Sequence, residues 1–417
     1  MTINHPVFSD KKRTYKGSFF LTGFHRTKRQ FFAGFFKNGE IIEAGSFSEG
    51  LTEEEKSALI NSLMKQVPRK TKKQKIAIKP SLCVELTFSG FSRNKLLHPK
   101  FSKFQLKDHP ESCTWSNLII KNLSISDSVQ VTNHDKRLWE TPPINKDQYV
   151  AYLSEIAERM LPFLQERTVT VKRAPQGVKD EVFYQKNCPE YAPPFVNTYH
   201  TDETDYIVCD NVSTLLWLGN QASIEFHIPF NTVKSENPGE IVFDLDPPGR
   251  EHFSLAIKAS RLMKERLDAF NITSFPKLSG NKGLQIHIPF FNRSLTYEDT
   301  RIFTSFMANY LTEKYSKDFT TERMKKKRGN KLYIDYVQHW RGKTIICPYS
   351  LRINEDATVA APLNWNEVNE NLNPIDYDLF SVLARVRKKQ CPLKKYFKTK
   401  NESVAEVIDM LKKNGHK

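Results

Sequence analysis

The segment Ile241–Pro248, IVFDLDPP, constrains the fold more than any other part of this sequence. Its apolar, β-branched beginning is typical of a buried strand. Asp244 and Asp246 lie two residues apart, so on a strand both carboxylates project from the same face. Two like charges at that spacing repel each other unless a cation lies between them, which favours a divalent metal site. The alternative is an ordinary turn at a strand end, because Asp and Pro are common in turns.

The length and composition indicate a globular protein with two or three domains. The chain has 417 residues, and no apolar run approaches the ~20 residues that cross a membrane. Its start contains no apolar segment of the kind found in secretory signals. The cysteines are far apart and form no CxxC pair, which favours a reducing compartment and argues against a zinc knuckle. We therefore expect a cytoplasmic protein that does not bind a membrane.

Positive charge is concentrated in the first third of the chain. Residues 1–125 contain 22 Lys and Arg against 10 Asp and Glu, a net charge of +12, whereas the whole chain carries +16. This distribution is typical of a nucleic-acid-binding module joined to a nearly balanced body. The alternative is a general charge that keeps the protein soluble.

Residues 16–115 have the pattern of short, aromatic-rich strands around a single helix. Thr52 and Glu55 form a capping-box signature for a helix that extends to about Lys65. The next segment, Arg69–Lys75, has the composition of an exposed basic loop. About five strands around one helix predict an OB-like barrel, a β-rich fold that often binds nucleic acid. We divide the chain into an OB-like domain (1–115), a linker (116–130) and a second domain (131–417).

The second domain contains both helical and strand-like segments. Asn145 can cap a helix over 146–165, whose apolar residues recur at helical spacing. We expect further helices over 214–225, 253–270 and 297–314, and strands over 168–175, 241–244 and 344–352.

Two further segments carry groups that suit phosphate chemistry. Asp335 is a third acid in a strand-like context, and three such acids could hold two divalent ions for phosphoryl displacement. Oxygen ligands select Mg²⁺ or Mn²⁺. The loop Ser279–Gly283 and Arg352 could neutralise a triphosphate, and we expect the basic loop 323–331 to face DNA. These are the groups that nucleotidyl transfer requires.

The segments DLDPP, SGNKGLQIHIP, LYIDYVQH and PYSLR, in this order and spacing, resemble the archaeo-eukaryotic primase-type polymerase domain of bacterial ligase D. The resemblance covers about residues 127–415 and implies an α/β core with an RRM-like catalytic sheet. It implies template-directed addition of ribo- or deoxyribonucleotides at DNA ends and gaps, with two Mn²⁺ or Mg²⁺ ions, during double-strand break repair by non-homologous end joining. The implied partners are gapped or broken DNA, Ku and a separate DNA ligase, in the bacterial cytoplasm near the nucleoid.

The resemblance also implies roles for individual residues. The catalytic and metal-binding acids are Asp244, Asp246 and Asp335. The nucleotide-binding residues are His227, Ser279, Lys282 and Arg352, together with Phe183 and Tyr184, which stand where the family usually has two Phe residues. The residues that bind the 5′-phosphate of the downstream DNA strand are Asn133, Lys136 and Lys146.

The phosphate loop departs from the family pattern at one position. Gln285 stands where the family has histidine, and His287 follows two residues later on the same strand face. Gln can donate a hydrogen bond to a phosphate but cannot carry charge. We therefore expect either weaker nucleotidyl transfer or partial substitution by His287, to which we assign no catalytic role.

The N-terminal segments TYKGSFFLTGF and KPSLCVELTFSGFSRNKLLHPKF resemble the OB-fold that follows the ligase nucleotidyltransferase domain. No KxDG motif, whose lysine would carry AMP, occurs in the sequence, and Leu97 and Gln105 stand where the OB-fold pattern has arginines. We therefore expect no ligation by this chain. The OB-like part either still binds DNA or is the remainder of a gene that has been shortened. The alternative function is a non-catalytic protein that binds and scaffolds DNA ends.

Overall fold

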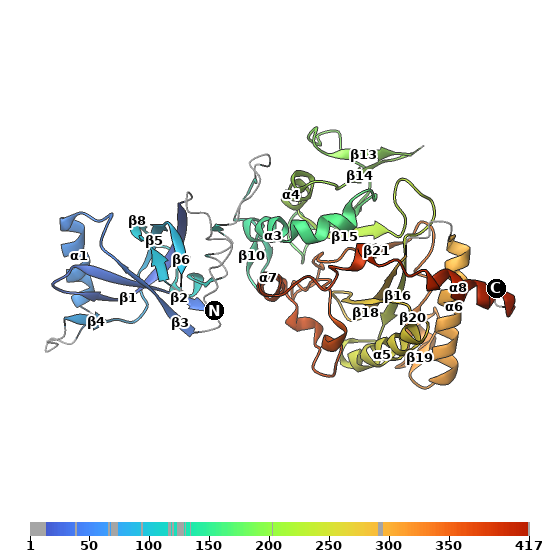
Figure 1. Ribbon diagram of the computed structural model, residues 1–417. Coiled ribbons are helices and arrows are strands. Elements are labelled where there is room, and N and C mark those ends of the chain that lie inside the picture. The colour runs from blue at the N-terminus through green and yellow to red at the C-terminus, as the bar shows by residue number, and fades with distance from the viewer. Residues whose placement is uncertain are drawn as a thin grey trace. The chain divides into compact units, whose positions relative to one another are not determined.

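The computed structural model describes residues 14–37, 40–65, 67, 74–92, 95–115, 118, 121–122, 129, 131–133, 135–201, 203–290 and 295–415. The chain forms two compact units, residues 1–124 and residues 125–417 (Figure 1). Most of the predicted linker, 116–130, and positions 69–73 of the predicted basic loop lie outside the described residues. Within the described part of the chain, no helix is long and apolar enough to cross a membrane.

The first unit is built on one antiparallel sheet with the strand order β3-β2-β1-β5-β8, and β4 pairs with β1. Its elements are β1 (Tyr15–His25), β2 (Gln30–Lys37), β3 (Glu40–Phe47), α1 (Glu53–Met64), β4 (Lys75–Ala77), β5 (Cys83–Phe88), β6 (Gly90–Ser92), β7 (Lys95–Leu97), β8 (Lys100–Phe104) and a 3₁₀ turn at Pro110–Ser112. Buried aromatic rings fill its core, among them Phe19, Phe24, Phe31 and Phe35.

The edges of this sheet meet at a single point. Glu49, just after β3, forms a parallel bridge with Lys100 of β8, and the Phe101 N–H donates to the Glu49 carbonyl at 2.8 Å. The sheet path itself stays open between β3 and β8, so the OB-like barrel remains a prediction. The predicted helix cap is confirmed: the Thr52 hydroxyl accepts from the Glu55 N–H, and the Glu55 carboxylate accepts from the Thr52 N–H.

The second unit contains two larger sheets and the helices that cover them. Its strands are β9 (Arg137–Trp139), β10 (Ile144–Asn145), β11 (Thr170–Arg173), β12 (Phe183–Gln185), β13 (Asn197–His200), β14 (Asp205–Val208), β15 (Ser223–Pro229), β16 (Glu240–Asp246), β17 (Phe275–Leu278), β18 (Leu284–Pro289), β19 (Phe319–Thr320), β20 (Leu332–Asp335) and β21 (Thr344–Ile346). Its helices are α3 (Lys146–Leu164), α4 (Val212–Asn220), α5 (Phe253–Ala269), α6 (Tyr297–Lys314), α7 (Leu379–Lys388) and α8 (Ser403–Lys413). Short 3₁₀ turns lie at Arg250–His252, Lys325–Lys327, Trp365–Glu367, Pro374–Asp376 and Tyr396–Lys398.

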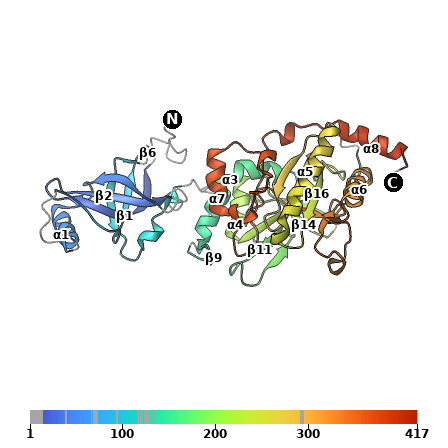
Figure 2. The same cartoon turned by 90° about the horizontal axis from the view of Figure 1, so that it is seen from below.

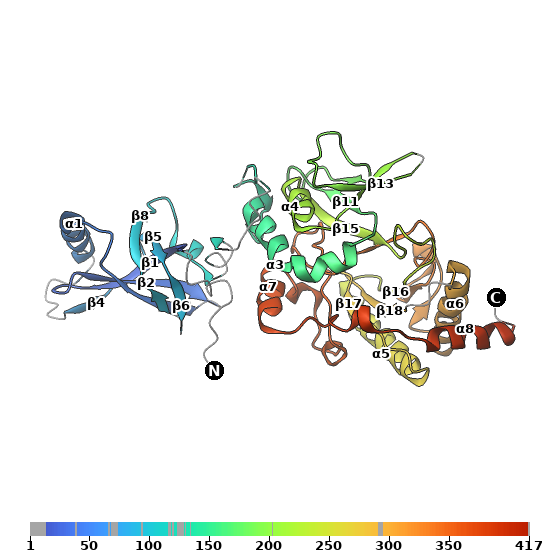
Figure 3. The ribbon, with the colours of Figure 1, turned by 45° about the horizontal axis from the view of Figure 1, so that its top comes forward.

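One sheet has the strand order β12-β11-β15-β21 and the other has the order β17-β18-β16-β20-β19. Figure 3 labels β11 and β15 of the first sheet and β16, β17 and β18 of the second. The mixed α/β architecture predicted for this part of the chain is therefore confirmed. Asn145 caps α3 in a capping box with Gln148, as its position before the helix predicted.

Side-chain alternation along β16 separates an apolar face from a polar face. Phe243 and Leu245 are fully buried, and the Phe243 ring lies 6.3 Å from Phe303 of α6. Helices α5 and α6 pack against β16 (Figure 2). Because neighbours on a strand point to opposite sides, Asp244 and Asp246 project from the other face.

Two predicted elements were wrong in extent. The helix expected over 214–225 ends at Asn220, and Ala222 has a left-handed φ of 55° before β15 begins. The residues from Ser223 onward belong to β15 instead. This strand pairs with β11 on one edge and with β21 on the other, and its side chains Ile224 and Phe226 are fully buried. The strand expected over 344–352 ends at Ile346, since Pro348 has no N–H to donate to a neighbouring strand.

Candidate functional site

A row of polar side chains crosses four strands of the β16 sheet at one level. The registers pair Lys277 of β17 with Gln285 of β18, Gln285 with Asp244 of β16, and Asp244 with Asp335 of β20. Residues directly opposite each other on antiparallel strands share a face, so all four side chains project from the same side of the sheet. Asp246 follows on that face, one step further along β16.

The three acids influence one another. Burial, together with the nearby charges of Asp246 and Asp335, raises the pKa of Asp244 to about 6, although a hydrogen bond from Gln285 acts in the opposite direction. Burial also raises the pKa of Asp335, whose Oδ1 accepts from the Tyr333 hydroxyl at 3.1 Å and the Gln338 N–H at 3.0 Å. Crowded carboxylates of this kind are relieved by a cation.

Two side-chain cations already lie beside Asp246. Lys282 Nζ is 3.0 Å from its Oδ1, and Arg328 Nη1 is 3.5 Å from its Oδ2. Among the described residues, no three His, Cys, Asp or Glu side chains are grouped closely enough to hold a metal ion. The chemistry of the donor set nevertheless fits a divalent ion, because three carboxylates share one sheet face and their mutual repulsion helps to raise the pKa values of Asp244 and Asp335.

The predicted phosphate loop, Ser279–Gly283, joins β17 to β18 beside these acids. The Ser279 hydroxyl accepts from the Asn281 N–H at 3.3 Å and the Gly283 N–H at 3.1 Å, which folds the loop tightly. Gly280 has a φ of 75°, and a Cβ there would lie 2.7 Å from Arg352 Cγ. The loop therefore requires glycine at this position, and it packs directly on the arginine that was predicted to act with it.

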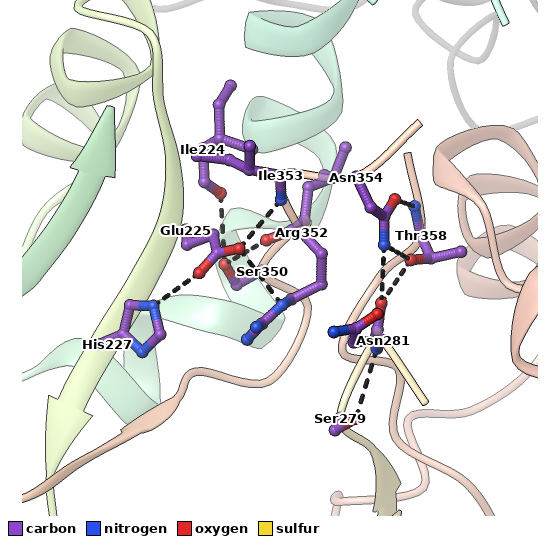
Figure 4. A network of polar contacts seen from close by, with 12 residues as sticks. Ile224, Glu225, His227, Ser279, Asn281, Ser350, Arg352, Ile353, Asn354 and Thr358 are labelled. Atoms are coloured by element: carbon purple, nitrogen blue, oxygen red, sulfur yellow. Dashed lines mark hydrogen bonds and ion pairs between the residues drawn. The ribbon is translucent and has the colours of Figure 1, made fainter. Parts of the chain in front are cut away.

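A buried glutamate connects His227 to Arg352 (Figure 4). Glu225 accepts from His227 Nε2 at 2.9 Å and from the Ile353 N–H at 3.0 Å, and its Oε1 is 3.3 Å from Arg352 Nε. Burial alone would raise the pKa of Glu225, but the His227 hydrogen bond and the Arg352 charge outweigh it and lower the pKa to about 2. Glu225 thus holds residues from two separate segments in one arrangement.

The two rings of the predicted aromatic pair lie on opposite faces of β12. Tyr184 pairs in register with Lys172, opposite Glu225, and its ring lies 6.1 Å from the His227 ring. Phe183 points the other way, toward Arg173, whose guanidinium carbon is 5.3 Å from the ring centre. Both rings are well exposed, at 42% for Phe183 and 62% for Tyr184.

Gln285 and His287 both point into the interior of the unit. Gln285 Nε2 donates to Asp244 Oδ1 at 3.1 Å, and its Oε1 accepts from Lys277 Nζ at 2.6 Å. The effect of Gln285 on nucleotidyl transfer stays a prediction; in this structure its amide lies between the buried Lys277 and Asp244. His287 Nδ1 lies 2.9 Å from Glu240, where it belongs to a structural network with Arg167.

Lys136 and Lys146, predicted to bind a 5′-phosphate, lie close together. Asn133 adopts a left-handed φ of 52°, its carbonyl accepts from the Lys136 N–H, and the Lys136 carbonyl accepts from the Lys146 N–H. Lys146 is only 5% exposed, and burial lowers its pKa, with further lowering by the charges of Lys136 and Arg173. A partly desolvated cluster of three positive charges favours binding of an anion.

A cationic cavity of about 610 Å³ lies on the far side of the acids from the phosphate loop, around β20. It is lined by Asp335 and by cationic and aromatic side chains, among them Arg301, Arg323, Arg328, Tyr333, Trp340 and Lys343. Arg328 also stacks on Tyr333, with its guanidinium carbon 3.7 Å from the ring centre. The predicted basic loop 323–331 thus contributes directly to a cavity beside an acid of the row.

Glu225, Lys277, Arg328 and Arg173 were not singled out in the sequence. Glu225 is two residues before His227, so strand alternation puts both on one face, a signal that the predicted helix over 214–225 concealed. Lys277 has no such signal, because its partner Gln285 becomes adjacent only through the register of β17 and β18.

Comparisons with known proteins agree with this geometry. The family model of the LigD primase-polymerase domain matches residues 145–393. The bifunctional non-homologous end joining protein LigD of Bacillus subtilis (strain 168) is 41% identical over 394 residues, which are 94% of this chain and 64% of that protein. The multifunctional non-homologous end joining DNA repair protein LigD of Mycobacterium tuberculosis (strain ATCC 25618 / H37Rv) is 30% identical over 272 residues, 62% of this chain and 35% of that protein.

Among solved structures, the polymerase domain of Mycobacterium tuberculosis ligase D in complex with DNA is similar to this chain, with a TM-score of 0.60 and 29% identity. The similarity covers 64% of this chain and 97% of that domain. This chain spans less than two thirds of the length of the Bacillus relative and about a third of the mycobacterial one. Because the family model matches residues 145–393 and the Bacillus relative is 41% identical over 94% of this chain, the chain belongs to the LigD primase-polymerase family.

Proposed function

We propose that this protein adds nucleotides to DNA ends and gaps under the direction of a template strand, during double-strand break repair by non-homologous end joining. The observation that carries the proposal is the contact between the phosphate loop and the acids: Lys282 Nζ lies 3.0 Å from Asp246. A triphosphate held by this loop would lie directly beside carboxylates suited to divalent ions. The names of the relatives support the same pathway.

Asp244, Asp246 and Asp335 would hold Mn²⁺ or Mg²⁺. When bound, two such ions stabilise negative charge on the attacking and leaving oxygens of a phosphoryl displacement. Lys282 is then released from Asp246 to bind the triphosphate together with Arg352 and the N–H groups of the loop. Ribonucleoside and deoxyribonucleoside triphosphates are both proposed as substrates.

The second set of residues acts on the nucleotide and the DNA. Tyr184 and His227 lie 6.1 Å apart and would contact the base or sugar of the incoming nucleotide. Lys136 and Lys146, with the backbone turn at Asn133, would bind the 5′-phosphate beyond a gap. Phe183 lies beside Arg173, on the opposite face of the sheet from His227.

DNA is the proposed macromolecular partner of both units. The cavity lined by Arg301, Arg323 and Lys343 offers positive charge next to Asp335, and the first unit, proposed to be OB-like, would add non-specific affinity. Ku and a separate DNA ligase are proposed partners in the pathway. Ligation is not proposed for these residues, because no KxDG motif occurs among them.

Extension of a primer across a gapped duplex tests the proposal. The substrate carries a 5′-phosphate at the gap, and the reactions contain Mn²⁺ with either ribo- or deoxyribonucleotides. We expect incorporation that follows the template and is lost, by at least a hundredfold, in Asp246→Ala. Asp268→Ala, which removes an exposed acid of α5, is the matched control and should keep full activity.

DNA-end binding without incorporation under every metal and nucleotide condition would contradict the proposal. That result would favour the alternative of a non-catalytic scaffold for DNA ends.

A further inference from the structure

Lys277 is a buried cation for which the proposed function has no use. Its side chain is inaccessible to solvent, and it touches neither the phosphate loop nor the cationic cavity. Burying a charged group is costly unless its surroundings compensate it, so its presence requires an explanation. The most informative features are its hydrogen-bond partners and its position in the polar row.

Burial lowers the pKa of Lys277 to about 7, whereas the hydrogen bonds around its amine favour the charged form. Three acceptor oxygens surround Nζ: Gln285 Oε1 at 2.6 Å, the Ile346 carbonyl at 3.2 Å and the Leu278 carbonyl at 3.4 Å. An ammonium group has three protons to donate, whereas a neutral amine has two. Ile346 belongs to β21, so these bonds also hold the side chain between the two sheets and leave it no path to solvent.

Gln285 relays the position of this charge to the acids. Because Lys277 only donates, it fixes the carbonyl end of the Gln285 amide, and the NH₂ end is left to face Asp244. The reversed amide would place its NH₂ against the ammonium and its carbonyl against the carboxylate. Lys277 therefore determines that Asp244 receives a hydrogen bond.

Three cations act on the three acids of the row from different positions. Asp244, Asp246 and Asp335 supply three negative charges, and Lys277, Lys282 and Arg328 supply three positive charges. Lys282 and Arg328, whose side chains are 28% and 13% exposed, contact Asp246 directly. Lys277 cannot leave, because it is enclosed between the sheets.

We propose that Lys277 is an internal counter-charge for the three acids, which positions Asp244 through Gln285 and limits the affinity of the site for divalent cations. The inference rests on the proposed function, because it assumes that the acids hold divalent ions. Lys277 touches no substrate and is a positioning residue. A fixed charge about 10 Å from a divalent ion, two strand spacings away, opposes its binding even in a partly shielded interior.

The test measures Mn²⁺ binding by electron paramagnetic resonance at pH 6.0, where Lys277 is mostly charged, with the full chain and without DNA or nucleotide. We expect Lys277→Met, which fills the same space without charge, to bind Mn²⁺ at least tenfold more tightly than wild type. Lys277→Gln, also neutral, should show the same direction if the Met variant does not fold. Lys264→Met removes a half-buried lysine of α5 that is paired with Asp268, and it should leave the affinity within twofold.

Thermal unfolding provides a second readout. The rise in Tm on adding Mn²⁺ should be larger for Lys277→Met than for wild type, because tighter binding stabilises the folded state more. A purely structural role for Lys277 would lower Tm equally with and without Mn²⁺.

Two results would overturn the inference in distinguishable ways. Affinity for Mn²⁺ that is unchanged or weaker in the folded Lys277 variants refutes the counter-charge and leaves the proposed function intact. A wild-type protein whose Mn²⁺ binding is absent, or is unaffected by Asp335→Asn, refutes both.

Discussion

Replacing Glu225 with glutamine removes one negative charge but leaves the size of the side chain unchanged. This side chain is only 4% exposed. The carboxylate accepts hydrogen bonds from His227 Nε2 and from the Ile353 N–H and lies beside Arg352. A glutamine amide offers one acceptor oxygen where the carboxylate offers two. In Glu225→Gln, one of these donors therefore loses its acceptor in a buried place.

The expected loss of stability follows from the pKa of Glu225. Its value falls from 4.5 to about 2 on folding, despite burial, because the ionised form is held by His227 and Arg352. Each pKa unit corresponds to about 1.4 kcal/mol, so ionised Glu225 contributes roughly 3 kcal/mol to the free energy of unfolding at neutral pH. Because the folded pKa is depressed, this contribution is present above pH 4.5 and is lost as the pH falls toward 2.

Urea unfolding followed by tryptophan fluorescence measures this difference. Four of the five tryptophans lie in the unit that contains Glu225, so they report mainly on its unfolding. Glu225→Gln should be roughly 3 kcal/mol less stable than wild type between pH 5 and 8, and the difference should fall to less than half by pH 3. Glu190→Gln, at an exposed glutamate, should change stability little at any pH.

Equal stability of Glu225→Gln and wild type at pH 7 would refute this reasoning. A difference of the same size at pH 7 and pH 3 would also refute it, because the loss would then not come from the ionised carboxylate.

The other predictions concern the phosphate pocket and the phosphate loop. Lys136→Ala should weaken binding to gapped DNA with a 5′-phosphate by about tenfold, measured by fluorescence anisotropy, because Lys136 adds charge beside the buried Lys146; an equal loss on unphosphorylated DNA would exclude a phosphate pocket. Gly280→Ala should lower the free energy of unfolding by about 2–3 kcal/mol, because its φ is 75° and the new Cβ would lie 2.7 Å from Arg352 Cγ. Gly329→Ala, with a φ of 58° but open space around it, should lose only about 1 kcal/mol, and equal losses at the two glycines would contradict the steric argument.

Local features of this chain could be predicted because they depend on neighbours in sequence. The capping boxes at Thr52 and Asn145 join residues three positions apart, and both form as their sequences indicate. Asp244 and Asp246 share a face because the strand repeat is two residues, whatever the rest of the fold does. The glycines of the loop Ser279–Gly283 similarly indicated a tight turn between two strands.

The misplaced end of the helix at 214–225 shows where this reasoning stops. The segment SIEFHIP was assigned partly to that helix, but β15 forms because β11 and β21 pair with it on either side. That error hid Glu225, whose importance depends on the strand. Likewise, no local pattern indicates the partners of Gln285, and only the register of β17, β18 and β16 places it between Lys277 and Asp244.

The sequence by itself determined the acids on one strand, the glycine loop and the helix caps, because backbone geometry relates residues only a few positions apart. The tertiary structure alone decided which charges meet. Lys277 and Asp244 are 33 positions apart in the chain, and Glu225 and Arg352 are 127 apart. Their contacts arise from strand pairing and burial, which depend on how the whole core packs rather than on any local pattern.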